Sequence, residues 1–148
     1  MNRKEFIKTC GVALIGLPFA SALLTSCESL YYATTSLSAD QNDIIVPLSE
    51  FKNIKKNRVV ERDFVLIQTA NQGFPICLYK TGENQYTAAL MKCTHRGCEL
   101  NVGGGIYSCP CHGSEFDRNG TVLEGPAEQD LKTFETTIKH DNIYIQLS

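Results

Sequence analysis

A chain of 148 residues, 43% hydrophobic and 20% charged, has the size and composition of one globular domain with a short extension, which excludes disordered and fibrous proteins. Its 14 lysines and arginines are balanced by 16 aspartates and glutamates, so no basic field is present to attract nucleic acid. Among seven cysteines, four lie within residues 93–112 together with two histidines. This concentration indicates a metal site or a disulfide.

Residues 1–27 are typical of an export segment. Arg3, Lys4 and Lys8 give it a basic start, and an apolar run over 11–24 follows. Because that run is shorter than the about 20 residues that span a bilayer, it favours a signal peptide over a membrane-spanning helix. An uncleaved N-terminal anchor helix is the alternative.

The end of this segment, Leu-Thr-Ser-Cys closing at Cys27, resembles the lipobox of bacterial lipoproteins. There a peptidase cuts before the cysteine, and the new terminal cysteine is lipidated. Residues 3–8 also resemble a twin-arginine export signal in which Lys4 replaces the second arginine. Both interpretations, cleaved lipoprotein and anchor, place the rest of the chain at a membrane on the periplasmic or extracytoplasmic side of a bacterium.

The next segment, residues 28–43, is polar, rich in Ser and Thr and without a helical period, which predicts a tether between membrane and domain. The folded domain is expected over residues 44–148, with a short turn of helix over 48–56. The basic stretch 52–58 indicates a solvated face, with docking to an acidic partner as the alternative.

Short runs of β-branched and aromatic residues follow one another along the domain, separated by turns that contain Gly, Asn and Asp. No segment after residue 28 has a sustained helical period. This pattern predicts an all-β sandwich or barrel. The expected strands are residues 44–48, 64–68, 74–79, 85–91, 106–108, 121–123, 134–138 and 142–147.

Two boxes carry the chemistry of the chain. Residues 93–98 have the pattern C-x-H-x-x-C, and residues 109–112 have the pattern C-x-C-H. Each box offers a cysteine and a histidine two or three positions apart, so that one loop can hold one metal centre with thiolate and imidazole ligands. An iron–sulfur cluster is one interpretation. A structural zinc site is the other, although zinc favours C-x-x-C knuckles, which these boxes do not contain.

Both boxes resemble those of Rieske proteins, in the branch found in cytochrome bc complexes, their relatives and the small subunit of arsenite oxidase. The resemblance continues through Phe116, Asp117 and Gly120 to residues 125–127, and it spans about residues 85–147. It implies a Rieske-type antiparallel sandwich or barrel. A small cluster-binding subdomain of two loops is expected over about residues 92–127.

The resemblance implies that Cys93 and Cys109 hold the buried iron of a 2Fe–2S cluster, and that His95 and His112 hold the outer iron. Two neutral imidazoles in place of two thiolates remove negative charge from the cluster. They raise its reduction potential to about −150 to +300 mV, against roughly −400 mV for all-cysteine plant ferredoxins.

In the same branch a disulfide joins the two loops, which implies a bond between Cys98 and Cys111 here. An exported protein is where such a bond persists. In the other large branch, that of ring-hydroxylating oxygenases and their ferredoxins, a small residue stands where this chain has Cys98 and an aromatic residue where it has Cys111.

The resemblance also assigns roles around the cluster. Ser114 matches a serine whose hydroxyl donates to a bridging sulfide and raises the potential. Gly97 and Gly113 let the backbone approach the sulfurs closely, and Pro126 shapes a third loop that covers the cluster.

Two positions differ from the respiratory members of the family. Phe116 stands where those members have a tyrosine that donates to a ligand sulfur, so we expect a potential below the highest in the family. Arg96 replaces an apolar residue after the first histidine. Its charge disfavours an apolar quinol pocket and suits an acidic protein surface, although a plain solvated side chain is the alternative.

The resemblance predicts one-electron transfer as the iron–sulfur subunit or carrier of a membrane-associated respiratory complex, quinol–cytochrome c reductase-like. The predicted partners are a cytochrome or a quinol-oxidising membrane subunit. The alternatives are the small subunit of an arsenite-oxidase-like molybdoenzyme, with its large subunit as partner, and the Rieske component of an oxygenase system. No independent catalytic site is evident in the sequence. Among the remaining residues, Cys77 is expected to be a buried thiol and His140 an exposed turn residue.

Overall fold

The structure is a computed structural model that describes residues 30–55, 57–70 and 72–147. In this part of the chain the regular structure consists of short strands and the single 3-10 helix η1 (Leu48–Phe51), which confirms the predicted all-β class. The strands are β1 (Ser36–Leu37), β2 (Asp43–Pro47), β3 (Lys52–Lys55), β4 (Arg58–Glu61), β5 (Phe64–Ile67), β6 (Ile76–Gly82), β7 (Gln85–Leu90), β8 (Asn101–Gly103), β9 (Ile106–Ser108), β10 (Glu115–Asp117), β11 (Val122–Glu124), β12 (Thr133–Phe134), β13 (Thr136–Lys139) and β14 (Asn142–Gln146).

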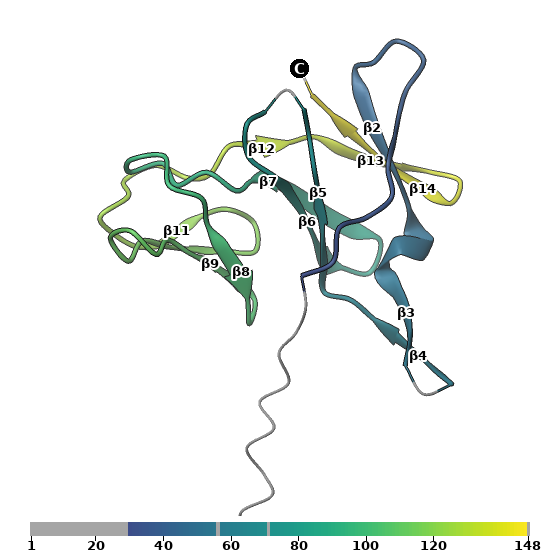
Figure 1. The fold of residues 1–148 in the computed structure, drawn as a ribbon, viewed down its shortest axis with the longest axis horizontal. Coiled ribbons are helices and arrows are strands. Elements are labelled where there is room, and N and C mark those ends of the chain that lie inside the picture. Colours follow the sequence, from purple (N-terminus) through teal and green to yellow (C-terminus); the bar gives the residue numbers. More distant parts are fainter. Residues whose placement is uncertain (1–29, 56, 71, 148) are drawn as a thin grey trace, which may run out of the picture.

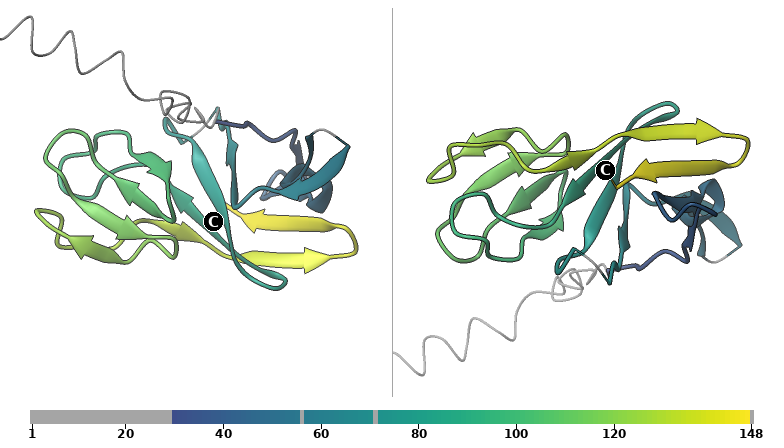
Figure 2. Two further views of the ribbon diagram at one scale, coloured as in Figure 1. Left: turned by 90° about the horizontal axis from the view of Figure 1, so that it is seen from below. Right: turned by 90° about the horizontal axis from the view of Figure 1, so that it is seen from above.

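The antiparallel sheet β12-β7-β6-β5 is the middle layer of the domain. Sheet β1-β2-β14-β13 packs on one of its faces, and the small sheet β11-β10-β9-β8 packs on the other (Figures 1 and 2). Neighbouring residues of a strand point to opposite faces. In β5, Val65 and Ile67 therefore enter the first core and Leu66 the second. Burial on both faces explains why β5 and β6 are nearly continuous apolar runs.

The second core joins the middle sheet to the small sheet, and it includes both free cysteines of the predicted site, Cys93 and Cys109. Residues from the middle sheet and its end, such as Cys77, Tyr79 and Met91, pack there against Leu100, Tyr107, Phe116, Ala127 and Leu131. These two cysteines are therefore positioned by the same apolar contacts that attach the small sheet to the middle sheet.

Part of the segment expected to be a free tether over residues 28–43 is bound to the domain. The Ala33 N–H donates to the Leu66 carbonyl at 2.8 Å, and the Leu66 N–H donates to the Tyr31 carbonyl at 2.9 Å. Strand β1 then pairs with β2. The folded domain thus begins before residue 44. This segment has no apolar pattern in its sequence, but its backbone N–H and C=O groups still pair with the edges of two sheets.

The strands that the sequence predicts are present, although one of them is divided, and the structure adds the unpredicted strands β1, β3, β4, β8 and β10. The run 134–138 is divided between β12, which pairs with β7 of the middle sheet, and β13, which pairs with β14 of the outer sheet. The helical turn expected over 48–56 ends at Phe51, because residues 52–55 form β3 and pair with β4. The cluster-binding loops follow β7 and β9 at the far end of the molecule from the β3–β4 hairpin (Figure 1).

Candidate metal centre

The first box, residues 93–98, is a closed loop after β7. The Cys93 N–H donates to the Cys98 carbonyl at 2.8 Å, and the Gly97 N–H donates back to the Cys93 carbonyl at 2.8 Å. Gly97 has a φ of +76°, which a residue with a side chain adopts only with strain. A Cβ at this position would also lie 3.1 Å from Cε of Lys92. This glycine is therefore required by the turn itself.

The second box, between β9 and β10, has the same hydrogen-bond pattern. The Cys109 N–H donates to the Ser114 carbonyl at 2.8 Å, and the Gly113 N–H donates to the Cys109 carbonyl at 3.0 Å. Gly113 has a φ of +82°, and a Cβ there would meet open space. Both boxes thus project as tight loops with the first cysteine at the base of each.

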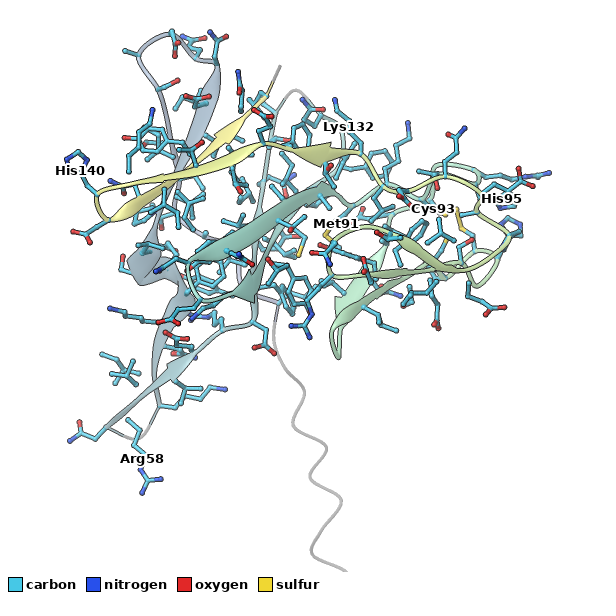
Figure 3. The ribbon with its side chains drawn as sticks, turned by 180° about the vertical axis from the view of Figure 1, so that it is seen from behind. Arg58, Met91, Cys93, His95, Lys132 and His140 are labelled. Atoms are coloured by element: carbon cyan, nitrogen blue, oxygen red, sulfur yellow. A yellow bond between two sulfur atoms is a disulfide. The ribbon has the colours of Figure 1, made fainter. Side chains whose placement is uncertain are left out.

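The two loops bring the cysteines and histidines of the boxes together in two layers. Cys93 and Cys109 are inside, with 2% and 4% of their surface exposed. His95 is half-buried and His112 is exposed, and their ring centroids lie 4.9 Å apart with the rings nearly perpendicular. Figure 3 shows Cys93 and His95 at the end of the molecule remote from Arg58. Sulfur donors thus lie toward the core and imidazole donors toward solvent.

Two polar features of this site point to a bound metal centre. The Nδ1 atom of His95 is buried and has no hydrogen-bond partner, although buried polar atoms in proteins are nearly always paired. Burial alone would raise the pKa of the Cys109 thiol. The backbone N–H groups of Cys111 and His112 and the thiol of Cys93 outweigh that effect and lower the pKa, which favours the thiolate.

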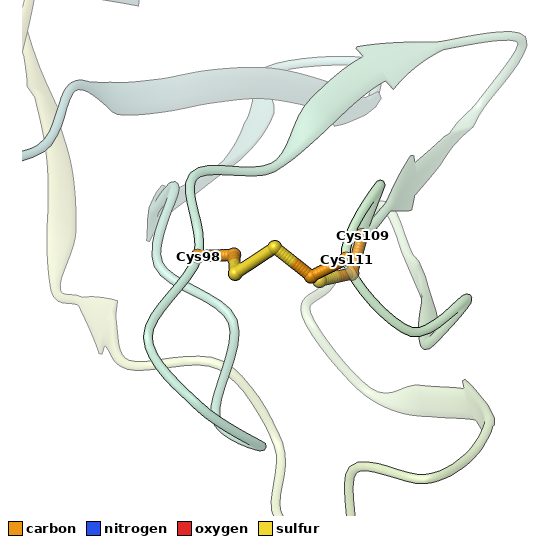
Figure 4. Close-up of side chains that lie close together, drawn as sticks. All are labelled: Cys98, Cys109 and Cys111. Atoms are coloured by element: carbon orange, nitrogen blue, oxygen red, sulfur yellow. A yellow bond between two sulfur atoms is a disulfide. The ribbon is translucent and has the colours of Figure 1, made fainter.

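The predicted disulfide between Cys98 and Cys111 is present, and it joins the two loops across a Cα–Cα distance of 6.5 Å (Figure 4). The sulfur of Cys109 lies within 4.8 Å of both disulfide sulfurs. Because the disulfide sulfurs carry no thiolate, they are not metal ligands in this state. Cys93 and Cys109 remain as the free thiols of the two boxes.

Residues 45–135 match the Rieske [2Fe-2S] domain family. The chain belongs to this family. The buried cysteine pair, the adjacent imidazoles and the unpartnered His95 nitrogen fit the two-cysteine, two-histidine donor set of such a cluster. A Rieske-type 2Fe–2S cluster is therefore the cofactor that this chain is built to hold, and the zinc alternative is set aside.

Several Rieske proteins are similar to this chain. A cytochrome b6-f complex iron-sulfur subunit of Synechococcus sp. (strain JA-2-3B'a(2-13)) is 45% identical over 53 residues, which cover 34% of this chain and 31% of that protein. The same subunit of Prochlorococcus marinus (strain NATL1A) is 37% identical over 78 residues, which cover 50% of this chain and 44% of that protein. The chain thus matches less than half the length of these relatives.

A solved structure, the cyanobacterial plasma membrane Rieske protein PetC3 from Synechocystis PCC 6803, is 36% identical to this chain. The match covers 57% of this chain and 86% of that one, with a TM-score of 0.51. This similarity supports the Rieske-type fold.

A third loop lies against the second box of this Rieske domain. Ser114 is fully buried, and its Oγ accepts a hydrogen bond of 3.0 Å from the Ala127 N–H. Ala127 follows Pro126 in the loop that was expected to cover the cluster. The acceptor role of the Ser114 oxygen leaves its hydroxyl hydrogen available to donate elsewhere.

Behind the site, Phe116 is fully buried in the second core and has no polar group to offer. Burial also raises the pKa of the Cys77 thiol to about 12, so this cysteine is the inert buried residue that the sequence predicts. The hydroxyl of Tyr107 lies beside that thiol and makes no hydrogen bond of ordinary geometry. His140 is exposed in the turn between β13 and β14, also as predicted.

A basic rim borders His95. An open depression of about 510 Å³ is lined by Lys92, Arg96 and Lys132 together with residues of the first box. The Thr94 hydroxyl donates to the Gln129 carbonyl at 2.6 Å and closes one side of it. Sequence reasoning selected Arg96 and missed Lys92 and Lys132. These two lysines are forty residues apart, and no local sequence pattern connects both of them with the histidine loop.

Proposed function

We propose that this chain passes single electrons between redox partners, with Cys93, Cys109, His95 and His112 as the ligands of its 2Fe–2S cluster. When bound, such a cluster accepts and donates one electron at a potential that its two histidine ligands raise. The observation that carries the proposal is the placement of the two thiols and the two imidazoles at the meeting point of two clamped loops.

The protein groups around this site hold the ligands and set their environment. The disulfide and the paired backbone bonds fix both loops, and the second core keeps water from the cysteines. The two histidines form the outermost donors, so electrons would enter and leave on their side. We assign Ser114 the hydrogen bond to a bridging sulfide, supported by its burial and its free hydroxyl hydrogen.

As for partners, we propose that the chain is the iron–sulfur subunit or carrier of a membrane-associated redox complex, quinol–cytochrome c reductase-like. Its relatives named as cytochrome b6-f subunits support this assignment. Arg96 is exposed beside His95, which supports docking to an acidic protein surface over an apolar quinol pocket. The large subunit of a molybdoenzyme is the alternative redox partner.

We further propose that the chain is exported and held at a membrane through a lipid on Cys27. Residues 1–29, with Cys10 and Cys27, lie outside the described residues, and among the described residues no helix has the length and apolarity to span a bilayer. The disulfide supports an extracytoplasmic location. The mass of the mature N-terminal peptide tests this: an unmodified Met1 or an unlipidated Cys27 would contradict it.

The ligand assignment is tested on the full chain purified with its cluster. We expect the dithionite-reduced protein to give a rhombic EPR signal of low average g, and Cys93→Ser and His95→Asn to abolish it. Cys77→Ala and His140→Asn are the matched controls, because they remove a buried thiol and an imidazole outside the site. A signal that survives H95N unchanged, or a colourless protein containing zinc, would overturn the assignment.

A further inference from the structure

The β3–β4 hairpin projects from the domain and belongs to neither core (Figure 1). Its apolar side chains are exposed: 75% of Ile54, 66% of Val59 and 44% of Val60. Ile54 pairs with Val59 across the strands, so the two side chains lie together on one face of the hairpin. An exposed apolar pair on a projecting two-stranded ribbon contributes nothing to the cores and indicates contact with another surface.

Basic residues lie along the hairpin beside this apolar pair: Lys52 is on the same face, and Lys55 and Arg58 pair with each other on the opposite face. Lys52, Lys55 and Arg58 are exposed on the hairpin, and Lys56 adds a fourth basic residue in the sequence. The single acidic residue of the two strands, Glu61, forms an ion pair with Lys80 at 2.5 Å. The hairpin thus presents a concentrated positive charge in a chain whose formal net charge is −2.

The base of the hairpin holds the N-terminal end of the described chain. The guanidinium of Arg62, the residue after β4, lies 3.7 Å from the centre of the Tyr31 ring. It also donates to the carbonyls of Glu50 and Lys52 at 2.9 Å, while the Tyr31 hydroxyl donates to the Glu50 carboxylate at 2.8 Å. Tyr31 therefore lies beside the foot of the hairpin, and Leu30, the first described residue, lines a hollow together with Asn101 and Pro110 of the cluster-binding subdomain.

We propose that the β3–β4 hairpin rests on an anionic lipid surface, that of the membrane to which the N-terminal segment is attached. The proposal rests on that attachment, and it goes beyond electron transfer. With the hairpin lying along the surface, Ile54 and Val59 would enter the boundary between headgroups and acyl chains, and Lys52 would contact lipid phosphates from the same face. The long side chains of Lys55 and Arg58 would reach phosphates around the edges of the hairpin. Strands of four residues extend about 13 Å, so the whole hairpin can lie on the headgroup layer.

Docking of the hairpin would orient the redox site. Figure 3 shows Arg58 and His95 at opposite ends of the molecule. With the hairpin on the lipid surface, the histidine end is held away from the contact. It would then face a partner protein beside this chain.

The absence of tryptophan from the chain permits a direct test. The full chain with its cluster is reconstituted as Ile54→Trp in vesicles of phosphatidylcholine alone or of phosphatidylcholine mixed with phosphatidylglycerol. Leu123→Trp, an exposed position in the cluster-binding subdomain, is the matched control. We expect I54W emission to shift to shorter wavelength, and to be quenched by brominated lipid, only in the anionic vesicles, and L123W emission to stay unchanged.

Adding Lys55→Gln and Arg58→Gln to I54W should lower the ratio of docked to undocked hairpin about 25-fold, since each basic side chain near an anionic surface contributes about fivefold. I54W emission that is identical on both kinds of vesicle, or equal shifts for I54W and L123W, would overturn the proposal. So would a hairpin that stays exposed on anionic vesicles and is protected only when an acidic protein is added, because its partner would then be a protein.

Discussion

At the scale of single residues, the reduction potential is set by donors close to the cluster sulfurs, and Phe116 is the position where a donor is missing. Its ring is fully buried in β10 beside the second box. Phe116→Tyr should raise the reduction potential by about 40 mV, because a hydrogen bond that strengthens by about 1 kcal/mol on reduction corresponds to that shift for one electron. Protein-film voltammetry on the full chain measures it.

Ser114→Ala gives the opposite sign in the same experiment. It removes the hydroxyl that would donate to the cluster and also the oxygen that accepts from the Ala127 N–H, so we expect the potential to fall by at least a similar amount. Tyr107→Phe is the control, because its hydroxyl has no hydrogen-bond partner in the structure. If F116Y and Y107F shifted the potential alike, the effect could not be assigned to a bond at position 116.

Much of this site could be predicted from the sequence, because its donors occupy two short boxes and the spacing within each box is local information. The division of these side chains into a buried and an exposed layer depends on how the chain folds between the two boxes. Only the structure shows which atoms remain unpaired, such as Nδ1 of His95. The basic rim could not be predicted from the sequence, because it too depends on which distant parts of the chain come together. Lys132 joins Lys92 through the packing of β12 against β7, a contact between distant parts of the chain.

At the scale of elements, strands with apolar or alternating patterns were predictable, and strands held only by backbone pairing were not. β5 and β6 bury both faces and are read directly as apolar runs. β3 and β4 have exposed, charged sequences typical of a loop, and their pairing with each other, not their composition, defines them as strands. β8 and β10 each contain one apolar residue, Val102 and Phe116, which is too little for a pattern although both residues pack in the second core.

The disulfide fixes the two loops of the site to each other, and its removal should loosen both loops. Cys98 and Cys111 are 13 residues apart, and closing a loop of this size restricts the unfolded chain by about 3 kcal/mol. In a domain of this size the loss should lower the temperature of cluster bleaching by roughly 10 °C in a Cys98→Ala/Cys111→Ala variant. Thermal loss of the visible absorption of the cluster measures it.

A reductant provides the internal control for this variant. Dithiothreitol should lower the bleaching temperature of the wild-type chain toward that of the double variant, and it should leave the double variant unchanged. A double variant that bleaches at the wild-type temperature would show that the second core alone fixes the loops.

At the scale of the whole molecule, each of the three layered sheets has a different role. The outer sheet and η1 hold the N-terminal segment and the hairpin, the middle sheet joins the two cores, and the small sheet carries the ligand loops at the opposite end (Figure 1). Tyr31 attaches the start of the described chain to Arg62 at the foot of the hairpin and to Leu66 of the middle sheet. Any swinging motion of the domain must therefore arise before residue 31 or break these contacts.

On the proposed function, the basic rim beside His95 is the surface that would meet a redox partner. Opposite charges accelerate the encounter of two proteins at low ionic strength, and salt screens the effect. Arg96→Glu combined with Lys132→Glu should therefore slow electron transfer to an acidic c-type cytochrome roughly 10- to 100-fold at low salt, and stopped-flow rates should converge with those of the wild type at high salt.

The control must change net charge equally at a distance from the rim. Lys139→Glu combined with Lys55→Glu does so on β13 and β3, outside the residues that line the depression. Because screening limits attraction to about 10 Å at 0.1 M salt, charge reversal there should alter the rate only slightly. Equal slowing by both double variants would mean that net charge alone governs the encounter. A faster rate for the R96E/K132E variant would mean that the partner docks on another face.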